Sequence, residues 1–318
     1  MATKIANRSE ILFIYDIRDG NPNGDPLDEN KPRMDEETGI NLVTDVRLKR
    51  TIRDYLHDFK EQEIFVREII ADQKNGYIQD AKTRAKDFEE SRTRILAECI
   101  DIRLFGGVIP TEKAVKKDSK SKTEKGGSIT FTGPVQFKMG RSLHKVSVKH
   151  IRGTGAFASD KESTKTTFRE EDILAYSLIQ FYGIINENAA QNTGLTEEDV
   201  TLMLEGMWNG IKNMMTRTKV GQVPRLLLKI NYSKKNYHIG DLDNMIKLVA
   251  RVPDETIRDV VDYKLDISEF IKTLKVQKEN IRDIELAANE RVKFILDGAD
   301  FKISDLATET EIAVSTRE

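Results

Sequence analysis

The chain has 318 residues, a length that suits one large domain or two ordinary domains. Hydrophobic residues make up 38% and charged residues 33%, and no run approaches the 18 apolar residues of a membrane-spanning helix. The single cysteine, Cys99, excludes an internal disulfide framework and a cysteine-rich zinc site. Because the opening MATKIANRSE also lacks the apolar core of a signal peptide, we expect a cytoplasmic protein without membrane contact.

Charge is distributed unevenly along the chain, although its net value is only −2. Residues 113–169 contain 14 Lys and Arg against 4 Asp and Glu, an excess of +10. Residues 254–318 contain 10 against 16, an excess of −6. This asymmetry indicates one basic surface for an anionic partner and one acidic surface that favours solubility. A lysine-rich loop beside an acidic helical tail would give the same counts.

The first expected elements are a strand, a turn and a helix. Residues 9–17, SEILFIYDI, favour a strand because they are rich in Ile, Phe and Tyr. The next segment, DGNPNGDPLDENKPR, is too dense in Gly, Pro, Asn and Asp for a regular element. Thr44 is then the expected N-cap of a helix that runs to about residue 59. Its spacing predicts a buried stripe of Leu48, Ile52, Tyr55, Leu56 and Phe59.

The middle of the chain gives weaker signals. Mixed helical pieces are expected from residue 60 to about 127, and they lead to Gly106-Gly107. The low-complexity stretch KAVKKDSKSKTEKGG that follows is expected to be a loop. Residues 128–137 are rich in strand-forming residues, and residues 145–151 alternate with period two, so both predict strands.

The next part of the chain predicts a loop, a strand, a helix and a further strand. Residues 153–167 are typical of a loop, and the apolar run 173–185 predicts a buried strand, with a buried helix as the alternative. Thr196 to Asp199 has the spacing of a capping box at the start of a helix that runs to residue 215. Residues 224–232 predict the last strand. In that helix Trp208 and the methionines are interpreted as core, and Gly206 and Gly210 as allowing close approach to a sheet.

Without the insertions, the order of elements is strand, helix, strand, strand, helix, strand. This order predicts an α+β fold, a ferredoxin-like sheet with helices on one face. The RNA-recognition motif has the same fold, but no segment matches its aromatic strand signature. Any bound RNA is therefore expected to be held by charges and loops more than by bases stacked on strand aromatics.

The sequence gives little evidence for catalysis. Asp16, Asp19, Asp25 and Asp28 are close enough in sequence to hold a divalent ion, but Asp is also an expected turn residue. The histidines have no metal-binding spacing; His144 and His150 could form an acid–base pair for RNA cleavage, although each lies in a basic segment that would hold RNA anyway. The phosphate-binding loop and the nucleophile elbow are absent from the sequence. We therefore expect no catalytic activity, no metal and no cofactor.

The basic face of the first helix is the stronger functional signal. Cations one helical turn apart can follow successive phosphates of a single strand. A solvated helix face balanced by Asp45, Asp54 and Asp58 is the competing interpretation. The glycine-rich turn before the helix shifts the balance toward binding, since backbone N–H groups beside a helix N-terminus suit phosphate oxygens.

The opening block NRSEILFIYDIRDGNPNGDPLDENKPRMDEETGINLVTDVRLKRTIRDYL closely resembles the backbone subunit of type I CRISPR (Cascade) complexes, particularly subtype I-B. The blocks ECIDIRLFGG, SITFTGPVQFKMGRSLH, GTGAFAS, FYGIINENAA and EGMWNG resemble the same family. The resemblance extends from about residue 9 to residue 243, and beyond it the role of the chain is open.

The resemblance implies a protein shaped like a right hand. Its RNA-recognition-like palm would comprise residues 1–59 and 128–240, with a thumb at 138–170. A helical finger domain would be inserted at 60–127, and a helical or mixed segment would follow at 241–318. Family members stack head to tail along the crRNA spacer, and each thumb presses out one nucleotide at a regular interval.

The expected RNA contacts lie in the turn, the first helix, the glycine pair and the basic thumb. They are Asn23, Gly24, Thr44, Arg47, Lys49, Arg50, Arg53, Gly106, Gly107, Lys138, Arg141, Lys145, Lys149, Arg152 and Phe157. Phe157, near the loop tip, is either tucked under its own loop or a wedge between nucleotides.

The resemblance also implies partners. They are crRNA, a target DNA strand, further copies of the chain, other Cascade subunits and, indirectly, a recruited nuclease-helicase. The alternative is a metal-dependent ribonuclease similar to type III backbone subunits, with Asp25 or Asp160 as the catalytic aspartate.

Overall fold

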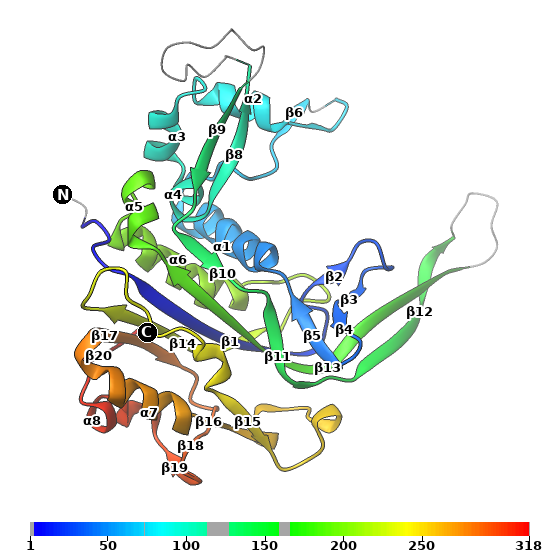
Figure 1. Ribbon diagram of the computed structural model, residues 1–318. Helices are drawn as coiled ribbons and strands as arrows, with labels where there is room; N and C mark the ends of the chain where they lie inside the picture. The colour runs from blue at the N-terminus through cyan, green and yellow to red at the C-terminus, as the bar shows by residue number, and fades with distance from the viewer. Residues whose placement is uncertain (1–2, 73, 113–126, 159–165, 318) are drawn as a thin grey trace.

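The computed structural model describes residues 3–72, 74–112, 127–158 and 166–317, and it is a mixed α+β structure (Figure 1). Within these ranges, ten strands form one sheet with the order β20-β17-β14-β1-β13-β11-β5-β4, and β10 and β12 also pair with β13. The strands are β1 (Ser9–Gly20), β4 (Met34–Asp35), β5 (Ile40–Val43), β10 (Val135–Phe137), β11 (Gly140–Lys145), β12 (Val148–Ala158), β13 (Thr166–Ile185), β14 (Val223–Tyr232), β17 (Ile281–Ala288) and β20 (Val314–Thr316).

The centre of this sheet is antiparallel. Strand β1 lies between β13 and β14. In this register Ser9 is opposite Ile185 of β13 and Asn231 of β14. The apolar run of β1 is buried on both faces because helices cover one side and the C-terminal part of the chain covers the other. The strands expected at 9–17, 173–185 and 224–232 are therefore present, and the helical alternative for 173–185 is wrong.

Helices α1 (Asp45–Lys60), α5 (Glu187–Thr193) and α6 (Glu197–Lys212) lie on the first face. Thr44 caps α1 as expected, because its hydroxyl accepts a hydrogen bond from the Arg47 N–H at 3.2 Å. The capping box of α6 is also present, formed by Thr196 and Asp199. Local hydrogen bonds between residues three apart thus set where both helices begin.

The packing of these two helices differs from the expectation in three respects. Gly206 and Gly210 allow α6 to approach α1 rather than the sheet, since a Cβ on Gly210 would lie 3.2 Å from the Thr51 carbonyl oxygen. Phe59, expected in the buried stripe, is 56% exposed. Met215, expected in the core, lies beyond the end of α6 and is 77% exposed.

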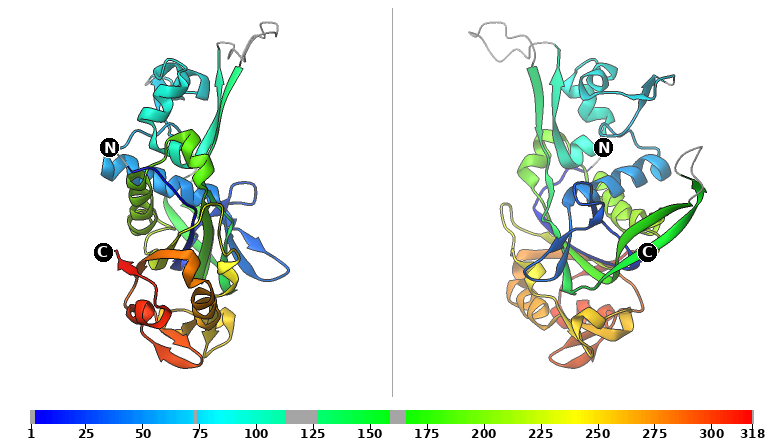
Figure 2. Two further views of the ribbon diagram at one scale, coloured as in Figure 1. Left: turned by 60° about the vertical axis from the view of Figure 1, so that its left-hand side comes forward. Right: turned by 90° about the vertical axis from the view of Figure 1, so that its right-hand side faces the viewer.

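The segment that follows α1 and precedes β10 in the sequence forms a separate body with its own core, seen at the top of Figures 1 and 2. It was expected to be helical, but β-hairpins make up a large part of it. Its elements are β6 (Ile70–Asp72), β7 (Tyr77–Ile78), α2 (Ala81–Asp87), α3 (Arg92–Glu98), α4 (Ile100–Phe105), β8 (Gly106–Thr111) and β9 (Gly127–Thr132). The strand expected at 128–137 is split: Ile129 and Phe131 belong to this core through β9, and only β10 joins the central sheet.

Strands β12 and β13 extend beyond the sheet as a long antiparallel arm. Part of the loop expected at 153–167 is therefore strand, since β12 continues to Ala158 and β13 begins at Thr166. The strand expected at 145–151 is interrupted between β11 and β12. Two further short strands, β2 (Gly24–Asp25) and β3 (Lys31–Pro32), form a hairpin in the turn before α1.

The C-terminal part of the chain packs on the second face of the sheet and also adds β17 and β20 to its edge. Its remaining strands form a four-stranded sheet, β15 (Lys247–Ala250), β16 (Tyr263–Asp266), β18 (Phe294–Leu296) and β19 (Ala299–Phe301). Its helices are α7 (Ser268–Gln277) and α8 (Leu306–Thr310), with the short 3-10 turns η1 (Leu242–Asn244), η2 (Asp254–Thr256), η3 (Val260–Asp262), η4 (Lys278–Asn280) and η5 (Ile303–Asp305). This part is thus continuous with the central sheet. In the portion of the chain that the structure describes, no helix is both long and apolar enough to cross a membrane.

Candidate nucleic-acid interface

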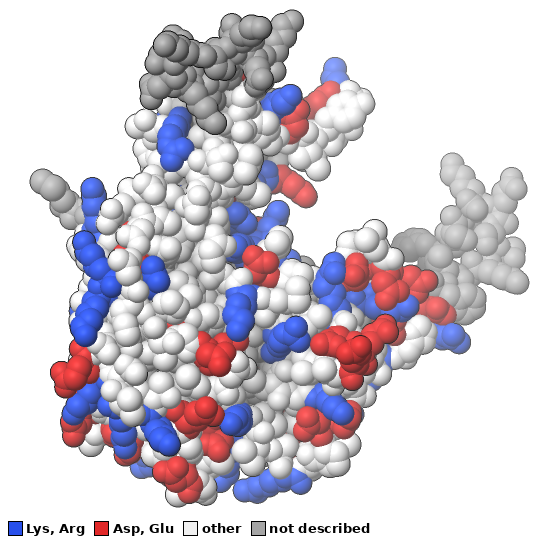
Figure 3. All heavy atoms as spheres, in the orientation of Figure 1, with Lys and Arg blue, Asp and Glu red and all other residues white. Residues whose placement is uncertain are grey.

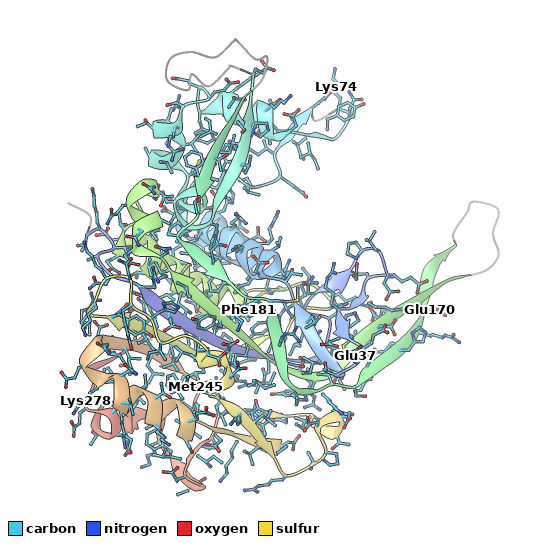
Figure 4. The ribbon with its side chains drawn as sticks, in the orientation of Figure 1. Glu37, Lys74, Glu170, Phe181, Met245 and Lys278 are labelled. Atoms are coloured by element: carbon cyan, nitrogen blue, oxygen red, sulfur yellow. The ribbon has the colours of Figure 1, made fainter. Side chains whose placement is uncertain are left out.

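Two projections flank α1. The body that carries β6 to β9, which we call the finger region, rises on one side, and the β12–β13 arm extends on the other, with α1 and the β2–β3 hairpin between them (Figures 1 and 2). In Figure 4, Lys74 marks the finger hairpin and Glu170 marks the arm, on opposite sides of this space. The space-filling view shows a broad indentation there, with Lys and Arg side chains on its floor (Figure 3). The fold therefore places the basic helix at the bottom of an open channel.

The turn before α1 fixes the start of the helix. The Asn23 side-chain oxygen accepts hydrogen bonds from the Thr44 N–H at 2.9 Å and from the Thr44 hydroxyl at 3.0 Å. Gly24 is required by close packing, since a Cβ there would lie 2.0 Å from the side-chain oxygen of Asn30. Three expected contact residues, Asn23, Gly24 and Thr44, are thus brought together at the helix N-terminus.

Arg47 and Lys219 are two half-buried cations near this helix start, and neither makes an ion pair among the residues that the structure describes. Burial, followed by the charge of Arg47, lowers the pKa of Lys219. Burial also lowers the pKa of Arg47, whose guanidinium contacts the Met214 sulfur at 3.1 Å. Asp54 acts on Arg47 from a distance, but its ion pair is with Arg50. Two neighbouring cations without an ion pair of their own favour an anionic ligand.

Sequence reasoning found Arg47 but missed Lys219. The Asn21 N–H donates to the Thr218 carbonyl at 2.7 Å, and this contact holds the segment after α6 against the turn before α1. A lone lysine in that segment carries no local signal, because its proximity to Arg47 depends on a contact between residues far apart in the chain.

The other cations of α1 already have carboxylate partners. Lys49 pairs with Asp45 at 2.9 Å, Arg50 with Asp54 at 2.7 Å, and Arg53 with Asp101 at 2.9 Å. Asp101 is fully buried, and it also accepts the N–H groups of Phe65 and Val66. Arg53 therefore joins α1 to the finger region.

The basic residues of the expected thumb are largely compensated. The ion pairs are Lys138–Asp243, Arg141–Asp35, Lys149–Asp19 and Arg152–Glu170. Lys145 is exposed and forms no ion pair within the described ranges. Phe157 lies on β12, but its side chain is outside the described part of the structure, as are residues 113–126. The +10 excess thus overstates the free positive charge of this segment.

Gly106 and Gly107, the glycine pair at the start of β8, are explained by the local backbone and packing. Gly106 has a φ of +67°, and a Cβ there would lie 2.3 Å from the Phe131 carbonyl oxygen. Gly107 pairs with Phe131 across the β8–β9 hairpin. Phe105, the preceding residue, contacts the cations of Lys49 and Arg53 at 5.7 Å and 5.1 Å. The pair therefore turns the chain beside the basic face of α1.

The four aspartates of the turn region do not converge on one site. Each is engaged separately, as Asp16 with Arg225, Asp19 with Lys149, Asp25 with Arg33 and Asp28 with Lys31. Within the described ranges, no group of three His, Cys, Asp or Glu residues could hold a metal ion. Asp160 is outside those ranges.

His144 cannot form the acid–base pair considered above in this arrangement. It is 3% exposed, its Nε2 accepts from the Leu178 N–H at 3.3 Å, and its Nδ1 donates to the Lys145 carbonyl at 2.7 Å. Burial lowers its pKa. His150 is exposed and contacts Asp172 at 3.0 Å. His144 is therefore a neutral structural residue.

Comparison with known proteins gives the family. The model of the family "CRISPR-associated protein Cas7" matches residues 7–268. The "CRISPR-associated protein Cas7" of Haloferax volcanii is 32% identical over 304 residues, which cover 90% of this chain and 88% of that protein.

Two solved structures are also similar. A chain of a "CRISPR RNA-guided surveillance complex, pre-nicking" has a TM-score of 0.52 and 11% identity, with 96% of this chain and 99% of that chain covered. A chain of a "CRISPR RNA-guided surveillance complex" has a TM-score of 0.49 and 13% identity, with coverages of 89% and 90%. The chain of the pre-nicking complex supports the overall fold. The family model and the Haloferax protein establish that this chain belongs to the Cas7 family of CRISPR-associated proteins.

Proposed function

We propose that this chain is a non-catalytic crRNA-binding backbone subunit of a type I CRISPR interference complex, with subtype I-B as the closest type. Membership of the Cas7 family supports this function. The single structural observation that carries it is the Arg47–Lys219 cation pair, which makes no ion pair with a carboxylate in the described residues and lies beside the capped start of α1. A phosphate of the RNA backbone would supply the missing negative charge.

The parts of the molecule take the following roles in this proposal. The central sheet with α1 and α6 is a ferredoxin-like palm, the body that carries β6 to β9 is the finger, and the β12–β13 arm is the thumb. The strand order β14-β1-β13-β11 and the two helices on one face support the palm assignment. The fifteen residues expected from the sequence are RNA contacts, with Lys219 added to them. The protein acts in the cytoplasm with a target DNA strand and other Cascade subunits.

Affinity for single-stranded RNA is expected to depend strongly on salt. If about five phosphates are neutralised per subunit, log K should fall with log salt with a slope of about −3.5 per subunit. Filter binding or fluorescence anisotropy between low and physiological salt measures this slope. An affinity that salt does not change would contradict a phosphate track.

Assembly is expected to follow the length of the RNA. Head-to-tail contacts between copies do not close into a ring, so they produce an open filament. The length of the RNA would then set the number of copies in the filament. Particle mass, measured by mass photometry on RNAs of increasing length, should rise in equal steps. The same mixtures with magnesium should show intact RNA on a denaturing gel. A fixed oligomer, or magnesium-dependent cuts at regular spacing, would contradict the scaffold role, and the cuts would favour a ribonuclease.

A further inference from the structure

The segment between α6 and β14, residues 213–222, carries Lys219 without forming a helix or a strand. The Lys219 N–H donates to the Thr216 carbonyl at 3.0 Å, and the Gln222 side-chain amide donates to the Lys219 carbonyl at 3.1 Å. These bonds make residues 216–222 a compact turn. The position of Lys219 therefore depends on where this turn docks.

Electrostatic attraction does not bring Lys219 to Arg47. Both side chains are cations, and burial, followed by the charge of Arg47, lowers the pKa of Lys219. Like charges that are close and partly buried repel each other. The turn has an ion pair to the arm, Arg217 with Glu171 at 2.7 Å, but Arg217 is 60% exposed, so solvent screens this pair. Contacts other than ion pairs must therefore hold the turn in place.

The turn docks on the end of β1. The Asn21 N–H donates to the Thr218 carbonyl at 2.7 Å, and Asn21 is 1% exposed. Gly20, the last residue of β1, is buried at this contact. A Cβ on Gly20 would lie 2.7 Å from the same Thr218 carbonyl oxygen and 2.4 Å from the Ile17 Cδ1. Because the φ of Gly20 is not in the left-handed region, glycine is needed here for space alone.

We propose that Gly20 is a positioning residue of the Arg47–Lys219 cation pair: the absence of a side chain at this position lets the turn dock on β1, and the docked turn holds Lys219 beside Arg47. The inference rests on the proposed function, because it concerns how the phosphate-binding cations are placed. Gly20 acts through Lys219 and does not touch the RNA. The two cations are held together before RNA binds, and this preorganisation reduces the cost of ordering the lysine on binding.

Gly20→Ala in the full chain is expected to displace the Thr218 carbonyl and, with it, Lys219. The affinity for a short single-stranded oligouridine, measured by fluorescence anisotropy, should fall about tenfold, as for the loss of one hydrogen bond to a charged group. The salt slope should shrink by about 0.7 per subunit, since one phosphate contact is lost. Native affinity with a native salt slope would overturn the proposal.

The pKa of Lys219 in the RNA-free protein is an independent measure of its position. In Gly20→Ala this pKa should rise toward the ordinary lysine value of 10.5, because the displaced side chain is better solvated and further from Arg47. A pH titration followed by NMR of the lysine side-chain carbons measures the pKa, and Lys219→Gln identifies the signal. An unchanged pKa would show that Lys219 has not moved and would overturn the proposal.

A double-mutant cycle separates positioning from a general effect on folding. In a Lys219→Gln background, Gly20→Ala should cause no further loss of RNA affinity, because the lysine through which it acts is already absent. Val220→Ala is the matched control, since Val220 is 57% exposed and follows Lys219 in the same turn. It should keep native affinity. An equal loss from Gly20→Ala with and without Lys219, or a comparable loss in Val220→Ala, would overturn the positioning role.

A second variant keeps the test independent of the clash between the new Cβ and the core. Ile17→Val deletes Cδ1 and leaves the Thr218 carbonyl oxygen as the closest neighbour of a Cβ at position 20. Relative to Ile17→Val alone, Ile17→Val with Gly20→Ala should show the same loss of affinity, while the melting temperature reports on the fold. Native RNA affinity in Lys219→Gln would contradict the cation pair itself and this inference with it, whereas the Gly20 results overturn the positioning role alone.

Discussion

Arg53→Glu is expected to lower the free energy of unfolding by about 3–5 kcal/mol, the usual cost of breaking a buried ion pair. Arg53 is the ion-pair partner of Asp101, which is fully buried. The substitution would leave that carboxylate without its counter-ion and place a second negative charge beside it. Because Asp101 also accepts the N–H groups of Phe65 and Val66, the finger region should loosen from α1. Urea unfolding, with hydrogen exchange at residues 64–105, measures both effects.

Arg50→Glu is the matched control on the same helix. Arg50 and Asp54 are 43% and 39% exposed, so their pair is screened by solvent and is worth about 1 kcal/mol or less. Stability after Arg50→Glu should therefore change little. Equal losses in the two variants would show that Asp101 does not depend on Arg53, and the structural role of Arg53 would be wrong.

Arg47→Gln combined with Lys219→Gln is expected to abolish stable RNA retention. The variant removes two phosphate partners from every copy along the RNA, so the salt slope should shrink by about 1.4 per subunit. Co-purification of RNA and the slope of log K against log salt measure the loss. Lys247→Gln with Lys278→Gln removes the same charge from exposed pairs of the C-terminal part and should leave binding unchanged.

The same variant should not lower the stability of the RNA-free protein. Burial lowers the pKa of both cations, so their charged forms are disfavoured in the folded state. Neutral glutamine removes that cost. For the native protein, the depressed pKa of Lys219 means that stability rises as pH increases toward the ordinary lysine value of 10.5. Native RNA affinity in the double variant would contradict the cation pair as the phosphate site, and a large fall in melting temperature would indicate a structural role instead.

Much of the candidate site follows from the sequence because its signals are local. Thr44 and the basic residues of α1 lie within a few turns of one another, so periodicity places them on one helix. Which of these cations is free could not be predicted. Arg53 pairs with Asp101, 48 residues further along the chain, and its burial depends on how the finger region docks. Charge counting likewise missed that distant carboxylates compensate Lys138 and Lys149.

The sequence alone determined where α1 and α6 begin, because their caps are hydrogen bonds between residues three apart. It also predicted three strands of the central sheet, β1, β13 and β14, whose runs of Ile, Leu and Phe require burial. Only the tertiary structure decided that Lys219 lies beside Arg47 and that Phe59 stays exposed. The physical reason is that helical periodicity states which face of α1 is apolar, whereas exposure and ion pairing depend on which distant segments come to cover each residue.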